Sequence, residues 1–230
     1  MNYSFKAIIF DLDGTLLNTL DDLANSMNHV LEIHGFPIYL VDQYRLLVGE
    51  GMYKLVLKAA TPYTNDLELI NLMFLQMNET YKKNWHHTTK PYPKIIEVLN
   101  LLSNVGFHLY VLSNKPEHFT KETVAYFFPK IPFDSVLGAT DDMPRKPDPA
   151  GVEKIITNSG LSPNDFLMIG DSGIDMNTAL NANIMAGGVL WGFRDKEELI
   201  QSGANFIFSH PDEIYALLIN SNEFGYNFII

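Results

Sequence analysis

The sequence predicts an α/β fold, a Rossmann-like parallel sheet core into which a small all-helical cap domain is inserted. Short, continuous apolar runs alternate along most of the chain with segments of helical periodicity, as expected for strands that are buried on both faces. Strands that alternate with helices form a parallel sheet covered on both sides. One stretch, from about residue 17 to residue 90, breaks this alternation and shows helical periodicity without a convincing strand.

The core elements are expected in a regular order. The first strand is predicted at Lys6–Phe10, an apolar run that stops abruptly at acidic residues. Further strands are predicted at Phe107–Leu112, Ser135–Leu137, Phe166–Ile169, Ile184–Leu190 and Asn205–Phe208. Helices are predicted at Ile95–Leu102, Glu117–Phe127, Ala150–Ser159, Asp175–Leu180, Lys196–Ser202 and Pro211–Ile219.

The helical insert is expected to hold three helical stretches. The first is Leu20–Ile33, and the second is Asp42–Lys58, interrupted around Gly49 and Gly51. The third is capped by Asp66 and places on one face Leu67, Ile70, Phe74, Met77, Tyr81 and Trp85. Two prolines at 91 and 93 mark the return to the core, so we expect a core domain at residues 1–16 plus 91–230 and a cap domain at residues 17–90. The tail at 220–230 receives no assignment.

Composition excludes several classes of protein. The 230 residues are 47% hydrophobic and 19% charged, which is ordinary for a globular protein. A net charge of −11 repels phosphate backbones and anionic lipid, so neither nucleic acid nor membrane is expected as a partner. The absence of cysteine excludes disulfides, iron–sulfur clusters and thiolate zinc sites. With no signal-peptide pattern at the N-terminus, a cytoplasmic location is expected.

A pair of carboxylates follows the first predicted strand in the motif Asp11-Leu-Asp-Gly-Thr15. Alternation along extended backbone points Asp11 and Asp13 to the same side, and Gly14 allows a sharp turn. Two ionised carboxylates this close need a cation between them, or one of them must keep its proton. Taken alone, such a pair is more often a turn that caps a helix.

Other polar groups follow the ends of the second and fourth predicted strands. Ser113 and Asn114 end the second, and Asp171 and Asp175 follow the fourth. Lys146 lies in a loop, before a proline that restricts its backbone. Because parallel sheets bind ligands beyond the carboxyl ends of their strands, we expect these groups to converge on one site. An all-oxygen site of this kind suits Mg²⁺.

In this order, the motifs resemble those of the haloacid dehalogenase (HAD) superfamily, and the helical insert resembles its small cap. Within the superfamily, four segments are most similar to those of phosphoglycolate phosphatases: Pro91-Tyr-Pro93, Ser113-Asn-Lys-Pro116, Arg145-Lys-Pro-Asp-Pro149 and Trp191-Gly-Phe-Arg194. Two positions depart from the pattern of such proteins, which commonly carry Asp where Asn18 stands and Gly where Lys94 stands.

The resemblance implies a role for each matching residue. Asp11 would attack phosphorus and form an aspartyl-phosphate, and Asp13 would act as general acid and then as general base. Ser113 and Lys146 would assist catalysis by holding the phosphate, and Asn114 would also bind it, together with Gly14 and Thr15 in the turn after the first strand. Mg²⁺ would be bound by the Asp11 carboxylate, the Asp13 backbone carbonyl and Asp171, with Asp175 close to the metal.

The cap is expected to select the leaving group. Its best candidates are Arg45, as a cation for a substrate carboxylate, and Gly49 and Gly51, which would permit close backbone approach; a surface arginine beside a helix break is nearly as good an interpretation. The expected activity is hydrolysis of a small phosphorylated metabolite, foremost 2-phosphoglycolate, by a monomer or weak homodimer. Phosphoryl transfer like that of β-phosphoglucomutase, pyrophosphate or nucleotide hydrolysis, and a catalytically silent binding module remain alternatives.

Overall fold

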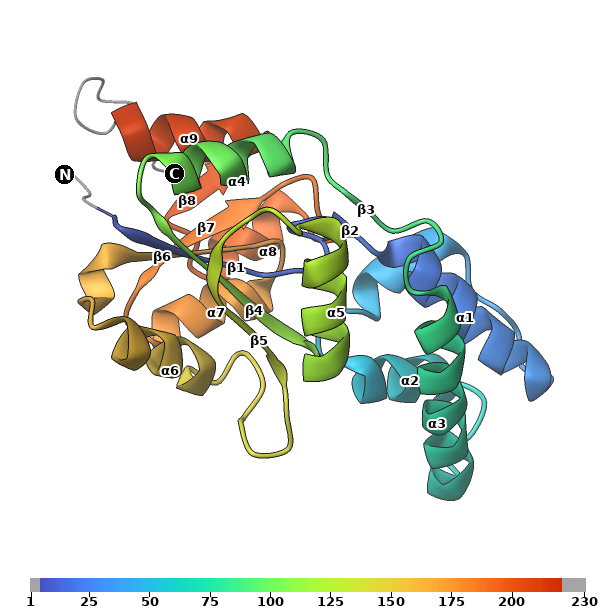
Figure 1. Cartoon of the computed structure of the whole chain (residues 1–230). Helices are drawn as coiled ribbons and strands as arrows, with labels where there is room; N and C mark the ends of the chain where they lie inside the picture. The colour runs from blue at the N-terminus through green and yellow to red at the C-terminus, as the bar shows by residue number, and fades with distance from the viewer. Residues whose placement is uncertain (1–4, 221–230) are drawn as a thin grey trace.

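The computed structural model describes residues 5–220 of the chain. The two ends of the predicted core domain, residues 1–4 and 221–230, lie outside the described residues. They include most of the tail that received no assignment. Figure 1 shows a sheet flanked by helices, with a separate group of helices beside one end of it. Among the described residues, none of the helices is long and apolar enough to cross a membrane.

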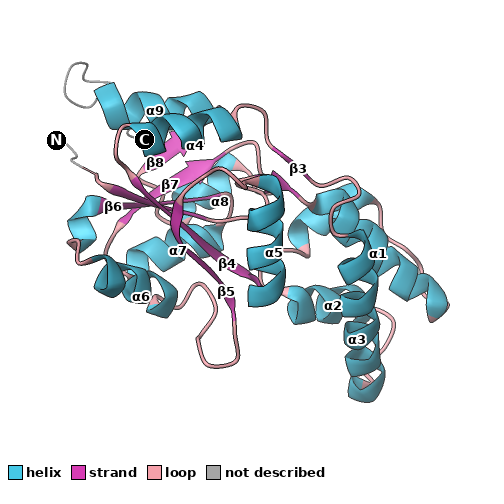
Figure 2. Cartoon of the chain, in the orientation of Figure 1, coloured by secondary structure: helices cyan, strands magenta, loops and turns pink. Residues whose placement is uncertain are grey.

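The core is a six-stranded sheet in the order β5-β4-β1-β6-β7-β8, and every neighbouring pair is parallel (Figure 2). The strands are β1 (Ala7–Phe10), β4 (His108–Pro116), β5 (Phe133–Ala139), β6 (Phe166–Gly170), β7 (Met185–Val189) and β8 (Phe206–Phe208). All six predicted strands are present, and the parallel α/β architecture is confirmed. β1 lies between β4 and β6 and is buried along its whole length, which explains its unbroken apolar run.

Helices cover both faces of this sheet. One face carries α4 (Ile95–Asn104), α5 (Glu117–Phe127) and α9 (Pro211–Asn220), and the other carries α6 (Ala150–Ser159), α7 (Gly173–Asn181) and α8 (Lys196–Gln201); a short 3-10 turn, η2 (Pro163–Asp165), precedes β6. Alternation along β1 divides its side chains between the two layers, because Ile8 and Phe10 pack in one apolar cluster and Ala7 and Ile9 in the other.

The inserted segment forms a third apolar cluster of its own. It contains α1 (Leu20–Ile33), η1 (Val41–Leu46), α2 (Met52–Ala60) and α3 (Leu67–Asn84). As predicted, Asp66 caps α3 by accepting hydrogen bonds from two backbone N–H groups. Leu67 is an exception to the predicted buried face of α3, since it is exposed. The helix expected at Asp42–Lys58 is split into η1 and α2 by a loop.

Two strands of two residues each join the insert to the core. β2 (Leu17–Asn18) pairs antiparallel with β3 (Lys90–Pro91), so the outgoing and returning chains lie side by side. The expectation of no strand within residues 17–90 was therefore wrong at both ends of the insert. A strand of two residues is too short to show a period of its own in the sequence. This two-stranded sheet lies at the boundaries predicted for the cap domain. Residues 17–90 are called the cap below.

Candidate active site

The acidic motifs lie at the carboxyl edge of the sheet. Asp11 follows β1 directly, and its backbone N–H donates to the carbonyl of Ile169 on β6. Asp171 follows β6, and Ser113 and Asn114 lie in β4 beyond Leu112, where regular pairing with β5 is interrupted. Since these strands run in the same direction, residues distant in the sequence meet at one edge, as the sequence predicted.

Three of the predicted carboxylates form one buried cluster. Asp11, Asp171 and Asp175 each offer an oxygen, and these oxygens lie within 4.8 Å of one another. Asp171 accepts a hydrogen bond from the backbone N–H of Phe193 at 2.7 Å, and Asp175 accepts one from the Ser172 hydroxyl at 2.7 Å. These partners hold the second oxygens of both groups and fix the direction of the carboxylates.

Lys146 inserts its ammonium group into this cluster. Its Nζ donates to Asp11 Oδ1 and to Asp175 Oδ1, both at 2.7 Å, and the lysine is itself buried. Its backbone is held by Asn114, whose amide oxygen accepts from Lys146 N at 2.9 Å and whose amide nitrogen donates to Lys146 O at 3.0 Å. The Asn114 side chain therefore positions the lysine.

Burial raises the pKa of two acids of the cluster, Asp11 and Asp171. Burial raises the pKa of Asp11, and although Lys146 opposes this effect, the nearby charges of Asp175 and Asp171 add to it. Burial and the neighbouring Asp175 likewise raise the pKa of Asp171 to about 7. For Lys146, burial lowers the pKa, but the charges of Asp11 and Asp175 outweigh it and raise the pKa overall. Lys146 is thus paired with two of the three acids, Asp11 and Asp175.

This donor set fits Mg²⁺. Three ionised carboxylates beside one ammonium group leave an excess of two negative charges in a buried site, which a divalent cation would balance. All the available ligands are oxygens, which Mg²⁺ prefers. The Asp13 carboxylate does not belong to the cluster found among residues 5–220, and the role of its backbone carbonyl as a metal ligand stays a prediction.

A cavity lies between this edge of the sheet and the cap. Its polar lining comes from the core and includes Asp11, Asp13, Ser113 and Asn114. Its apolar lining comes mostly from the cap, through Leu23, Val48, Met52 and Leu55, with Pro116 added by the core. The predicted glycines at 49 and 51 also line it, and the carbonyl oxygen of Gly49 accepts a hydrogen bond from the Asn114 amide at 3.1 Å. The cap thus closes directly over the acidic cluster.

Asp13 is paired with a residue that the sequence did not single out. The ammonium group of Lys115 lies 3.0 Å from Asp13 Oδ1 and donates at 2.6 Å to the hydroxyl of Tyr81, on cap helix α3. Burial raises the pKa of Tyr81 to about 12. Lys115 was visible only as part of the Ser113-Asn-Lys-Pro116 segment, and a single lysine beside a phosphate motif is a weak signal.

Arg45 contacts the core and a neighbouring aspartate, and it does not line the cavity. Its Nη1 donates at 2.7 Å to the carbonyl oxygen of Gly192 in the core, and its Nε pairs with Asp42. It is not among the described residues that line the cavity against Asp13, so the structure does not bring it to the place expected for a substrate cation. Arg194, the last residue of the Trp191-Gly-Phe-Arg194 segment, donates to the carbonyl oxygen of Val48 at 3.0 Å.

The turn after β1 is packed tightly against Asp171. Gly14 has a φ of +92°, and a Cβ at this position would lie 2.2 Å from Asp171 Oδ2. Thr15 is buried, and its hydroxyl lies 3.5 Å from Asp171 Oδ1. Both residues therefore pack against Asp171 and restrict its position.

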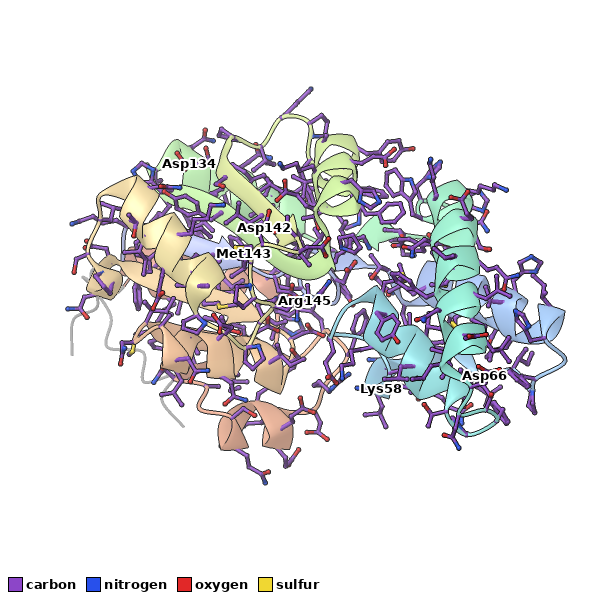
Figure 3. All side chains as sticks on the ribbon, turned by 90° about the horizontal axis from the view of Figure 1, so that it is seen from below. Lys58, Asp66, Asp134, Asp142, Met143 and Arg145 are labelled. Atoms are coloured by element: carbon purple, nitrogen blue, oxygen red, sulfur yellow. The ribbon has the colours of Figure 1, made fainter. Side chains whose placement is uncertain are left out.

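Arg145 (labelled in Figure 3) lies close to the cap, since a Cβ at Gly51 would lie 3.4 Å from its Nε.

The known proteins to which this chain is similar are hydrolases of one family. The family model described as haloacid dehalogenase-like hydrolase matches residues 8–189. A phosphoglycolate phosphatase of Vibrio cholerae is 31% identical over 225 residues, covering 94% of this chain and 96% of its own. One from Vibrio vulnificus strain YJ016 is 31% identical over 207 residues, covering 88% and 91%. The crystal structure of a predicted phosphoglycolate phosphatase from Haemophilus somnus superposes with a TM-score of 0.86 at 28% identity, covering 93% and 98%.

Proposed function

This chain belongs to the haloacid dehalogenase-like hydrolase family as one of its phosphatases, and from that premise we propose that it is a Mg²⁺-dependent phosphomonoesterase that acts through an aspartyl-phosphate on Asp11. The proposed substrate is 2-phosphoglycolate or a similar small phosphorylated acid. The observation that carries the proposal is the buried cluster of Asp11, Asp171 and Asp175 around Lys146, which lines a small cavity together with Val48 and Gly49 of the cap.

In the first half of the reaction, an oxygen of Asp11 would form a bond to phosphorus while the ester bond breaks. The leaving oxygen takes a proton from Asp13, which lines the same cavity. In the second half, Asp13 removes a proton from water, the water oxygen attacks phosphorus, and the Asp11 carboxylate leaves with the electron pair. The products are the alcohol and inorganic phosphate.

The charges around Asp11 make this attack feasible. A carboxylate that approaches a phosphate dianion is strongly repelled in a partly dry site. The Lys146 ammonium, at 2.7 Å from Asp11, and the Ser113 hydroxyl offer the positive and donor groups that oppose this repulsion. Mg²⁺ held by Asp11, Asp171 and the Asp13 carbonyl, with Asp175 nearby, would supply the largest positive charge and orient the phosphate.

The size of the cavity between Asp13 and the cap supports a small leaving group. Its volume is about 50 Å³, where a water molecule needs about 10–15 Å³. This is room for about three to five water-sized groups, which suits a small leaving group better than a sugar or a nucleoside. The names of the Vibrio relatives point to the same substrate. A cytoplasmic location and a monomeric or weakly dimeric state stay predictions.

A phosphate-release assay tests the proposal. With Mg²⁺, the wild-type protein should release phosphate from 2-phosphoglycolate with a higher kcat/KM than from glucose 1-phosphate or pyrophosphate, and Asp11→Asn should abolish turnover. Chelation of the metal should stop the reaction reversibly. Conversion of glucose 1-phosphate to an isomer with little free phosphate would instead identify a mutase. No turnover of any ester, including p-nitrophenyl phosphate, would identify a silent binding module.

A further inference from the structure

One cation lines the cavity on the side where the leaving group would lie. Among the described residues that line the cavity between Asp13 and the cap, Lys115 alone carries a positive charge. It is only 5% exposed and lies on β4, two residues after Ser113. It therefore brings a buried ammonium group next to the proposed phosphate site.

The ammonium group is held in place by one core residue and one cap residue. It donates to Asp13 at 3.0 Å and to the Tyr81 hydroxyl at 2.6 Å, and it lies 4.6 Å from the centre of the Tyr81 ring. The Lys115 carbonyl oxygen accepts a hydrogen bond from the Thr120 hydroxyl, which fixes the backbone. A longer hydrogen bond also reaches Asp13 Oδ2 at 3.3 Å, so both carboxylate oxygens of Asp13 contact this ammonium group. Its positive charge borders the cavity, where a further carboxylate would be attracted to it.

Three other cations near the cavity have structural contacts. Lys146 is paired with Asp11 and Asp175 inside the acidic cluster. Arg45 and Arg194 each donate to a backbone carbonyl oxygen across the boundary between cap and core. None of these three lines the cavity between Asp13 and the cap, whereas Lys115 does.

We propose that Lys115 binds the carboxylate of the substrate and so makes this phosphatase selective for phosphorylated acids. The inference deepens the proposed function and rests on it. A carboxylate that enters the cavity beside Asp13 meets repulsion, and the Lys115 ammonium between the two groups removes it. A neutral group of the same size gains no such ionic contact, and the cap side chains that line the cavity are apolar.

Tyr81 is the positioning residue for this contact. Its hydroxyl is fully buried and comes from the cap, while Lys115 belongs to the core. The ammonium group is therefore held at its place only when the cap lies over the sheet. Tyr81→Phe should weaken selectivity without removing it, because the charge stays and only its anchor is lost.

The test compares two substrates of similar size. They are 2-phosphoglycolate and 2-hydroxyethyl phosphate, in which a hydroxymethyl group replaces the carboxylate. For each variant, kcat/KM is divided by the wild-type value, so that the intrinsic reactivity of each ester cancels. Lys115→Met should lower the value for 2-phosphoglycolate about 10- to 100-fold more than that for 2-hydroxyethyl phosphate, the range expected for a charged hydrogen bond. Most of this difference should appear in KM.

Arg45→Met is the matched control, since it removes the cation first expected to bind the carboxylate. It should lower both values by the same factor. Selectivity that survives in Lys115→Met, or that is lost in Arg45→Met, would overturn the assignment. Circular dichroism checks that each variant is folded.

A binding measurement needs no variant and no turnover. Isothermal titration of the wild-type protein with Mg²⁺ should show about 10-fold or tighter binding of 3-phosphonopropionate, which keeps the carboxylate, than of propylphosphonate, which lacks it. Equal affinities would overturn the proposal. If the wild-type protein hydrolyses both esters without preference, the phosphatase function stands and this inference fails. If it hydrolyses neither, the proposed function itself fails.

Discussion

Arg45 and Arg194 form reciprocal contacts across the boundary between the cap and the core. Arg45, in the cap, donates to the carbonyl oxygen of Gly192 in the core at 2.7 Å, and Arg194, in the core, donates to the carbonyl oxygen of Val48 in the cap at 3.0 Å. Arg194 also pairs with Glu198 at 3.3 Å, and its Nη1 is buried with no partner among the described residues. The two arginines act as a latch that holds the cap over the acidic cluster.

Removal of either arginine should loosen this latch. Arg45→Met and Arg194→Met should each lower kcat/KM about 10-fold, for 2-phosphoglycolate and p-nitrophenyl phosphate alike, because a hydrogen bond from a charged donor contributes about 1.5–3 kcal/mol. Amide hydrogen exchange at residues 48–51, where the cap contacts the core, should become faster. The double variant should lose less than the product of the two single effects, since both bonds close the same boundary. Independent, multiplicative losses with unchanged exchange would contradict the latch.

Lys146 should be as important for stability as for catalysis. In Lys146→Met, Asp11 and Asp175 lose the buried cation that lies between them. Breaking a buried ion pair in this way costs about 3–5 kcal/mol, so the free energy of unfolding without Mg²⁺ should fall by that order. Mg²⁺ should restore part of the loss and should stabilise the variant more than the wild type. Urea unfolding with and without Mg²⁺ measures both effects.

Lys121→Met is the control for this prediction. Lys121 pairs with Glu117 on the exposed face of α5, where ion pairs contribute little. Its removal should change stability by less than about 0.5 kcal/mol, with or without the metal. Equal metal responses in Lys146→Met and the wild type would argue against the acidic cluster as the metal site.

The sequence predicted the elements that are long enough to show a pattern. Buried parallel strands appear as continuous apolar runs, and α1, α5 and α6 begin and end at their predicted residues. The β2–β3 ribbon was missed because its strands are two residues each. Position 94 illustrates another limit. Lys94 has a φ of +66°, a conformation that favours the glycine common there in similar proteins. A lysine in the sequence does not indicate such a backbone conformation.

The structure brings together the predicted acids and Lys146, but it does not place the cations near the cap as the sequence suggested. Motifs at strand ends brought Asp11, Asp171 and Asp175 together, because the topology of a parallel sheet alone places them there. The partners of Arg45 and Lys115 depend on how the cap packs on the core, which is a long-range contact without a sequence period. The sequence therefore favoured Arg45 in the cap as the cation for the substrate carboxylate. The structure instead places Lys115, on β4, in the wall of the cavity.

Gly14 should tolerate no side chain. Gly14→Ala would place a Cβ 2.2 Å from Asp171 Oδ2, at a φ of +92°, so Asp171 must move out of the acidic cluster. We expect a loss of activity of at least about 100-fold, together with weaker binding of Mg²⁺, as when a group that orients a metal ligand is lost. Metal titration by calorimetry and the phosphate-release assay measure the two effects.

Gly35→Ala separates this contact from backbone strain. Gly35 also has a positive φ, +69°, but a Cβ there meets no atom within 4 Å. The variant should lose only about 1–2 kcal/mol of stability and keep its affinity for Mg²⁺. If both alanine variants bind Mg²⁺ like the wild type, Asp171 is not held by the turn in the way the structure indicates.

Asp22 should anchor the two ends of the cap in a pH-dependent manner. Its carboxylate, at the start of α1, accepts hydrogen bonds from the backbone N–H and the hydroxyl of both Thr88 and Thr89, just before β3. Burial acts to raise the pKa of Asp22, but these hydrogen bonds outweigh it and lower the pKa below its ordinary value of 3.8. The folded protein thus favours the ionised form, and its stabilising effect is complete above pH 3.8 and is lost as the pH falls through the lowered pKa.

Asp22→Asn replaces one acceptor oxygen by an N–H donor that faces other donors. Near pH 7 it should lower the free energy of unfolding by about 2–3 kcal/mol, and the difference from the wild type should shrink as the pH falls to about 3. Asp66→Asn, at the exposed cap of α3, is the control and should change stability little, because Asn and Asp cap helices equally well. Urea unfolding at several pH values measures the difference. A deficit in Asp22→Asn that is the same at every pH would mean that these hydrogen bonds do not depend on the charge of Asp22, and that the anchor acts through shape alone.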